Sequence, residues 1–147
     1  MYKRQLHNLG QRPILEIESE LNQFKSIRPI GLVLPSLFSE LEGPALSGIV
    51  DEIAKVPYLE EIVVGLDNAT QDEFKHSLDY FSRLPHHHRI LWNDGPRLCA
   101  IDKKLRGIGL APTHKGKGRN VWYCYGYILA SGRSEACLLY TSPSPRD

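Results

Sequence analysis

The stretch IGLVL, residues 30–34, decides the fold class. It is a continuous apolar run without alternation, and Pro35 and Ser36 follow it directly. Because both faces of such a run are apolar, it is typical of a strand that is buried on both sides within a parallel sheet. We therefore predict a buried strand over residues 30–34 that Pro35 and Ser36 end.

Similar runs recur along the chain and alternate with helical patterns. Further buried strands are predicted at EIVVGL (61–66) and RILWN (89–93). Amphipathic spacing predicts helices over residues 42–54, 71–84, 98–105 and 119–130. This alternation indicates the α/β class, with a Rossmann-like parallel sheet, right-handed crossovers and helices on both faces. A helix over residues 15–25, after Pro13, is expected to pack on this domain, so residues 1–27 form an N-terminal extension.

The composition excludes several classes of protein. The chain has 147 residues, 41% hydrophobic and 24% charged, which is the balance of one soluble globular domain. A net charge of +1 gives no sign of a nucleic-acid partner, and no apolar run approaches the roughly 18 residues of a membrane span. Three cysteines without CxxC spacing show neither a disulfide framework nor a metal site, so we expect a reduced, cytoplasmic protein.

The last eleven residues, CLLYTSPSPRD (137–147), have an unusual origin in our interpretation. The same string is obtained by translating a widely used transposase sequencing adapter in one frame. A natural Ser/Pro-rich terminus is the alternative, but an identity over eleven residues makes chance agreement very rare. We therefore expect that residues 137–147 are not native, that the main domain occupies residues 28–136, and that the natural protein continues beyond Ala136.

Polar residues gather where the predicted strands end. Residues 35–40 (PSLFSE), 67–70 (DNAT) and 93–95 (NDG) lie at the carboxyl ends of the three strands. In parallel sheets ligands bind beyond the carboxyl ends of the strands. Glu40 or Asp67 could accept hydrogen bonds from a ribose or a base, and the backbone near Pro35, Ser36 and Leu37 could meet a base edge.

The GKG sequence at Gly116, Lys117 and Gly118 is the second candidate element. Flanking glycines let the backbone approach a ligand, and the ammonium group and the following helix N-terminus both favour phosphate. Alternatives stay open, because Glu40 could serve a helix entry, Asp67 a turn, and GKG a solvated loop.

Other groups carry weaker signals. Asp94, in the turn after the third strand, is read as a turn residue with a place near a ligand as the minority interpretation. The run at 86–88, HHH, is expected to be an exposed loop rather than a metal site, since adjacent residues cannot readily converge on one ion. Neither GxxxxGK[ST] nor GxGxxG occurs, which disfavours Walker-type and dinucleotide sites.

Taken in order, the loop at 35–40, Asp67 and the GKG-opened helix resemble the donor-binding, N-terminal half of a GT-A glycosyltransferase. Within that group the chain is similar to glucosyl-3-phosphoglycerate synthase and its relatives. The resemblance covers residues 28–136. It implies that the donor-binding residues are Pro35, Ser36, Leu37, Glu40, Asp67 and Lys117, with Asp94, Gly116 and Gly118 as further candidates.

The resemblance also implies an activity. The full-length enzyme would transfer glucose from a nucleotide diphosphate sugar to a small acidic acceptor such as 3-phosphoglycerate, and a homodimer is left open. It would use a divalent metal (Mg or Mn) at a D-x-D motif that is absent here, so this chain is expected to be inactive alone and to hold no catalytic residue. The alternative is a non-catalytic doubly wound domain that binds a nucleotide or a phosphorylated metabolite.

Overall fold

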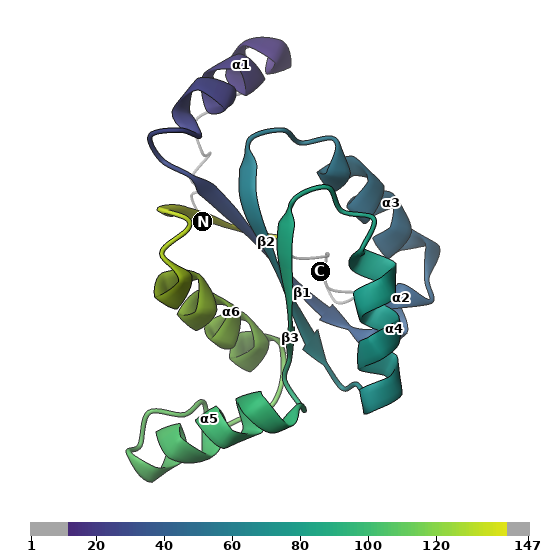
Figure 1. Ribbon diagram of the computed structural model, residues 1–147, viewed down its shortest axis with the longest axis vertical. Helices are drawn as coiled ribbons and strands as arrows, with labels where there is room; N and C mark the ends of the chain where they lie inside the picture. The colour runs from purple at the N-terminus through teal and green to yellow at the C-terminus, as the bar shows by residue number, and fades with distance from the viewer. Residues whose placement is uncertain (1–11, 141–147) are drawn as a thin grey trace, which may run out of the picture.

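The computed structural model describes residues 12–140 and has an α/β architecture (Figure 1). Four parallel strands form one sheet in the order β3-β2-β1-β4. The strands are β1 (Ile30–Leu37), β2 (Leu59–Asp67), β3 (His87–Trp92) and β4 (Ala136–Leu139). The helices are α1 (Ile14–Phe24), α2 (Phe38–Leu41), α3 (Pro44–Ala54), α4 (Gln71–Phe81), α5 (Pro96–Gly107) and α6 (Lys117–Ser131). The predicted parallel α/β sheet is confirmed.

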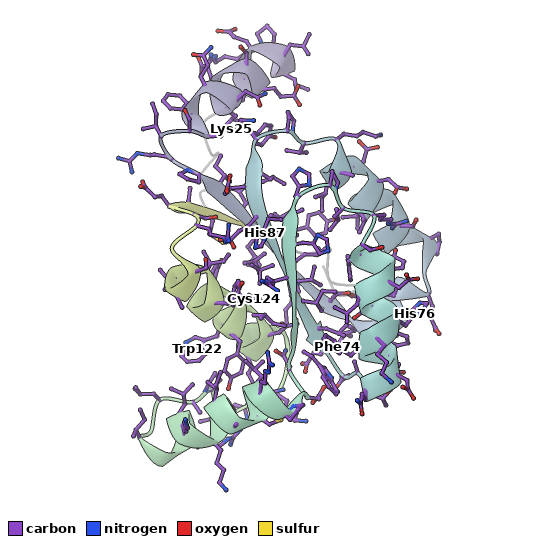
Figure 2. The ribbon with its side chains drawn as sticks, in the orientation of Figure 1. Lys25, Phe74, His76, His87, Trp122 and Cys124 are labelled. Atoms are coloured by element: carbon purple, nitrogen blue, oxygen red, sulfur yellow. The ribbon has the colours of Figure 1, made fainter. Side chains whose placement is uncertain are left out.

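Helices cover both faces of the sheet. Helices α3 and α4 lie on one face and α6 lies on the other (Figure 1). The strands divide their side chains accordingly, because successive residues of a strand point to opposite faces. Leu34, Ile62 and Leu66 belong to the larger core cluster on the α3/α4 side, and Val33 and Val63 pack with Cys124 of α6. Cys124 faces the sheet, whereas Trp122 lies on the outer side of α6 (Figure 2).

Strand β1 continues further than its sequence suggested. The prediction that Pro35 and Ser36 end the strand is wrong, since β1 runs through both of them to Leu37. Proline lacks the N–H that a ladder needs, so it is tolerated only where no neighbour requires that donor. The paired part of β4 ends opposite Val33, two residues before Pro35. No β4 carbonyl therefore requires a backbone N–H from Pro35.

The histidine run is also placed differently. His87 and His88 begin β3 and are half-buried, so the prediction of an exposed loop is wrong for these two residues. Their backbones pair with Glu61 and Ile62 of β2. Strand β3 therefore begins two residues earlier than the apolar pattern predicted. His86 precedes the strand and its Nε2 lies 2.6 Å from the carbonyl oxygen of Val56.

The two ends of the chain bear on the predicted domain boundaries. Helix α1 buries none of its residues, although Leu21 packs against the larger core cluster. Residues 1–11 of the predicted extension and 141–147 of the predicted adapter tail lie outside the described residues. Strand β4 includes residues 137–139, which belong to the predicted adapter tail. Their pairing with β1 uses backbone groups and so does not depend on whether these residues are native. In the part of the chain that the structure describes, no helix is long and apolar enough to cross a membrane.

Candidate functional site

The carboxyl ends of β1 and β2 lie side by side and bring the first predicted site residues together. Leu37 pairs with Asp67 at the last position of the shared ladder. Ser36 and Asp67 are buried, and Leu37 is exposed. The predicted loop and the predicted acidic residue therefore meet at one edge of the sheet, as the parallel arrangement requires. We call this the carboxyl edge.

Glu40 serves the entry of the one-turn helix α2. Its Oε2 accepts hydrogen bonds from the backbone N–H of Leu37 at 3.0 Å and from the Ser36 hydroxyl at 3.1 Å. These bonds satisfy a backbone donor at the start of α2 that has no partner within the helix. These bonds order the loop after β1. Glu40 is itself exposed, so its carboxylate remains accessible at the carboxyl edge.

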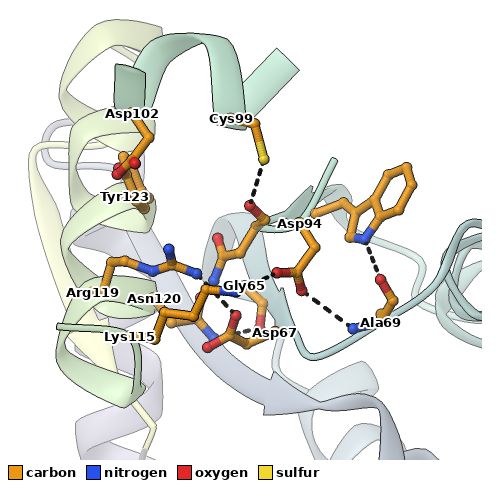
Figure 3. Close-up of polar contacts among 12 residues, drawn as sticks. Gly65, Asp67, Ala69, Asp94, Cys99, Asp102, Lys115, Arg119, Asn120 and Tyr123 are labelled. Atoms are coloured by element: carbon orange, nitrogen blue, oxygen red, sulfur yellow. Dashed lines mark hydrogen bonds and ion pairs between the residues drawn. The ribbon is translucent and has the colours of Figure 1, made fainter. Parts of the chain in front are cut away.

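Asp67 forms a buried ion pair with Arg119 of α6. Nη2 of Arg119 donates to Oδ1 of Asp67 at 3.3 Å, and the side chains are only 6% and 5% exposed (Figure 3). Removing one partner of such a pair leaves an uncompensated buried charge, which makes the pair a strong constraint on the position of α6.

A second bond fastens the same turn of α6 to β2. Asn120 Nδ2 donates to the carbonyl oxygen of Gly65 at 2.8 Å. Gly65 permits this approach, because a Cβ at that position would lie 1.8 Å from Asn120 Oδ1 and 2.7 Å from Cys124 Sγ. The first turn of α6 is therefore held against the end of β2.

The GKG sequence opens α6 at the same edge. Gly116 is the N-cap, with φ of 136°, a conformation that residues with a Cβ rarely adopt, and Lys117 is the first helical residue. Gly118 follows in the first turn. Lys117 is exposed and lies two residues before Arg119, which reaches Asp67. The helix N-terminus and its lysine are thus brought to the edge that holds Leu37 and Asp67.

Asp94 also lies at this edge, after β3. Its Oδ2 accepts from the backbone N–H of Ala69 at 3.3 Å, and its Oδ1 pairs with Lys115 Nζ at 3.4 Å (Figure 3). Trp92 donates from Nε1 to the carbonyl oxygen of Ala69 at 2.8 Å. The turn after β3 is therefore tied both to the loop after β2 and to the segment that precedes α6.

The surface is hollowed next to the loop after β1. A depression of about 310 Å³ lies between α2 and the start of α4, lined by Leu37, Phe38, Ser39, Glu42, Asn68 and Glu73. The start of α4 is fixed by a capping box, in which Thr70 and Glu73 exchange hydrogen bonds. The depression places carboxylates and backbone groups around an opening beside the carboxyl edge.

A metal does not fit the residues that the structure describes. Within residues 12–140, no group of three or more histidine, cysteine, aspartate or glutamate side chains could hold an ion. Of the carboxylates at the carboxyl edge, Asp67 and Asp94 are each engaged by a cationic side chain, and Glu40 accepts hydrogen bonds from Ser36 and Leu37.

Helices α5 and α6 are joined by a separate polar contact. The hydroxyl of Tyr123 donates to Asp102, which also pairs with Arg106 at 2.6 Å. Burial, followed by the hydrogen bond to Asp102, raises the pKa of Tyr123 to about 12. The hydrogen bonds from Tyr123 and then Arg106 lower the pKa of Asp102. This contact links α5 to α6.

Comparison with curated proteins identifies relatives of this arrangement. The chain is 38% identical over 135 residues to a protein from Persephonella marina named glucosyl-3-phosphoglycerate synthase. The match covers 92% of this chain and 34% of that protein. A protein of the same name from Methanococcoides burtonii is 34% identical over 113 residues, which is 76% of this chain and 28% of the relative.

The chain is related to glucosyl-3-phosphoglycerate synthases. The resemblance that its motifs predicted is confirmed. The chain spans about a third of the length of these relatives. No family profile matches it, and no solved structure matches it significantly.

Sequence reasoning missed the contacts of Arg119 and Asn120 at the carboxyl edge and placed Asn93 within a strand. Arg119 and Asn120 follow the GKG sequence directly, but nothing in their spacing says that they reach Asp67 and Gly65. Asn93 was counted as the last residue of a strand and is instead a buried amide just past β3. A glycine inside the otherwise bulky run of β2 was the one available signal that another element approaches there.

Proposed function

We propose that this chain forms the donor-binding half of a glycosyltransferase. The full-length protein would transfer glucose from a nucleotide diphosphate sugar to a small acidic acceptor such as 3-phosphoglycerate. The names of the two relatives support the sugar and the acceptor. The carboxyl edge supports the donor, since it gathers a loop, a carboxylate and a helix N-terminus where nucleotide ligands bind in such sheets.

One observation carries this proposal: the first turn of α6 is fastened to the end of β2 through Arg119 and Asp67. The backbone N–H groups and dipole of that helix start attract an anion. Because Arg119 neutralises Asp67, the buried carboxylate does not oppose a diphosphate, and the exposed ammonium of Lys117 is free to meet it.

The nucleoside would occupy the side of this edge formed by β1. The backbone of Pro35, Ser36 and Leu37 would meet the base, while Glu40 and Asp67 would accept hydrogen bonds from the nucleoside. Gly116 and Gly118 would let the diphosphate approach the helix start, and Asp94 would border it. Each of these residues lies at or next to the carboxyl edge, which is the geometric support for these roles.

The catalytic step belongs, in this proposal, to parts of the full-length protein that this chain does not contain. A D-x-D motif holding Mg or Mn would lie there, and residues 137–147 would replace its beginning with translated adapter. The chain of 147 residues is therefore expected to bind a donor without transferring the sugar.

Isothermal titration calorimetry with uridine diphosphate glucose and guanosine diphosphate glucose tests the donor site. The purified chain should bind at least one of them, and Lys117→Ala should weaken binding by about tenfold or more, the usual loss for a charged hydrogen bond. Lys103→Ala, which removes an exposed lysine of α5, is the matched control and should bind like the parent chain. Equal affinity of both variants, or no binding to the parent, would contradict the proposal.

A further inference from the structure

Helices α1 and α5 lie at opposite ends of the molecule and leave apolar side chains open to solvent (Figure 1). Among the described residues, neither helix buries any of its own. On α1, Ile14 is 73% exposed and Phe24 is 54% exposed. On α5, Ile101 is 48% exposed, and Ile108 at its end is 68% exposed. Scattered apolar residues are ordinary on a protein surface, but apolar residues that share one side of a helix indicate a surface that meets a partner.

The apolar residues of α1 do share one side of the helix. They follow the spacing i, i+3, i+7 and i+10, and they are Ile14, Ile17, Leu21 and Phe24. Leu21 packs against the larger core cluster, which fixes the helix on the domain. The domain therefore covers the middle of this side and leaves its two ends exposed.

On α5, cations and isoleucines alternate along one side. They follow the spacing i, i+4, i+7 and i+11, and they are Arg97, Ile101, Lys104 and Ile108. All four side chains are exposed. A different side of α5 carries Asp102, which accepts a hydrogen bond from Tyr123 of α6. The helix is therefore held on α6 by one side and presents the mixed apolar and basic side to solvent.

The two helices carry opposite charges. Helix α1 has three glutamates and no basic residue, which gives −3, whereas α5 has four basic residues and one aspartate, which gives +3. Arg12 contacts both Glu16 and Glu20, and one cation does not neutralise two carboxylates. The ion pairs within residues 12–140 do not include Glu18 or Lys104. The surface that complements α5 in charge and in apolar character is thus present on the chain itself.

We propose that α1 of one copy of this chain docks against α5 of a second copy, and that α5 of the first copy receives α1 of the second. Because the two helices lie at opposite ends of the molecule, two copies side by side in opposite directions make both contacts at once (Figure 1). Such a two-fold arrangement is self-complementary and closes at two copies. The contact covers the exposed isoleucines of α5 and sets its cations against the glutamates of α1. This interface does not depend on the proposed donor site.

Sedimentation velocity of the 147-residue chain over a range of concentrations tests the proposal. We expect a monomer–dimer equilibrium that shifts toward the monomer at high salt, because salt screens exposed charges. Ile101→Glu places a carboxylate against the acidic α1 and should weaken dimerisation by about tenfold or more. Leu78→Glu is the matched control, because Leu78 is 47% exposed and lies on α4, on the other face of the sheet. This control should dimerise like the parent chain.

Charge reversal tests the pairing of α1 with α5 in particular. Arg97→Glu together with Lys104→Glu changes the charge of α5 from +3 to −1 and should weaken dimerisation. Adding Glu16→Lys and Glu18→Lys to the same chain changes α1 from −3 to +1 and should restore dimerisation, at least in part. Circular dichroism checks that each variant keeps its fold, which is expected because the substitutions avoid buried residues.

Several results would overturn the proposed interface. They are dimerisation of Ile101→Glu and of the α5 reversal at parental strength, an equal loss in Leu78→Glu, no recovery in the fully reversed chain, or assemblies that grow beyond two copies. A parent chain that stays monomeric at every concentration would also overturn it. Binding of that monomer to vesicles containing phosphatidylserine would then assign the basic side of α5 to an anionic membrane surface instead.

Discussion

Gly65→Ala offers the sharpest test of how α6 is held on the sheet. The added Cβ would lie 1.8 Å from Asn120 Oδ1, 2.7 Å from Asn120 Cγ and 2.7 Å from Cys124 Sγ. No rotamer change of an alanine relieves these contacts. Either α6 must move away from β2, or the 2.8 Å hydrogen bond from Asn120 to Gly65 must break.

The expected cost follows from these contacts. Overpacking a close-packed interface costs about 1–3 kcal/mol, and a buried amide that loses its partner costs a further 1–3 kcal/mol or so. The two effects overlap, so we expect a loss of about 3 kcal/mol in the free energy of unfolding. That is a large part of the roughly 5–15 kcal/mol that stabilises a typical domain.

Urea unfolding followed by circular dichroism measures this loss. Gly126→Ala is the matched control, because Gly126 lies in α6 and a Cβ there would meet nothing within 4 Å. It should raise stability by about 0.5–1 kcal/mol, since alanine favours a helix over glycine. If Gly65→Ala is as stable as the parent, the close fastening of α6 to β2 is refuted.

Three further predictions concern side chains around α6. Arg119→Met should lower the free energy of unfolding by about 3–5 kcal/mol, because it leaves Asp67 charged and unpaired. Adding Asp67→Asn should recover part of that loss. If urea unfolding shows that the losses of the two substitutions simply add, this coupling is contradicted. The pKa of Tyr123 is raised to about 12 from an ordinary 10.0, so its contribution to stability is complete below pH 10 and is lost as the pH rises through about 12. The phenolate absorbance difference between the parent and Tyr123→Phe should therefore titrate near pH 12, and a midpoint near 10 would be inconsistent with burial. Burial raises the pKa of Cys124 to about 12, whereas Cys99 is exposed. After brief alkylation at about pH 8, mass spectrometry should therefore show that Cys99 is modified before Cys124. Equal labelling of both residues would show that Cys124 is not protected.

The sequence was informative about element type and less so about where elements meet. Apolar runs at 30–34 and 62–66 identified two buried strands, because burial on both faces favours apolar residues at successive positions. The same criterion predicted that β1 ends before Pro35. The sequence does not show that β4 stops opposite Val33, which is why Pro35 can lie within the strand. The apolar pattern also missed His87 and His88. These residues belong to β3 because their backbones pair with β2, and backbone pairing does not require apolar side chains.

The candidate site shows a similar division. The positions of Leu37 and Asp67 could be anticipated, because they end adjacent parallel strands. The partner of Asp67 could not, since Arg119 lies 52 residues further along the chain and only the packing of α6 brings it there. The interpretation of Glu40 as a helix-entry carboxylate, left open by the sequence, describes the bonds that its side chain makes.

Mapping a bound nucleotide by nuclear magnetic resonance tests the central claim most directly. Uridine diphosphate should shift backbone amide signals of the 147-residue chain at residues 36–40, 67–70, 93–95 and 115–119, which all lie at the carboxyl edge. Signals at the opposite end of the sheet, such as Glu61 and Ser134, should stay in place. Shifts that cluster at that opposite end, or that spread evenly over the chain, would contradict a donor site at the carboxyl edge.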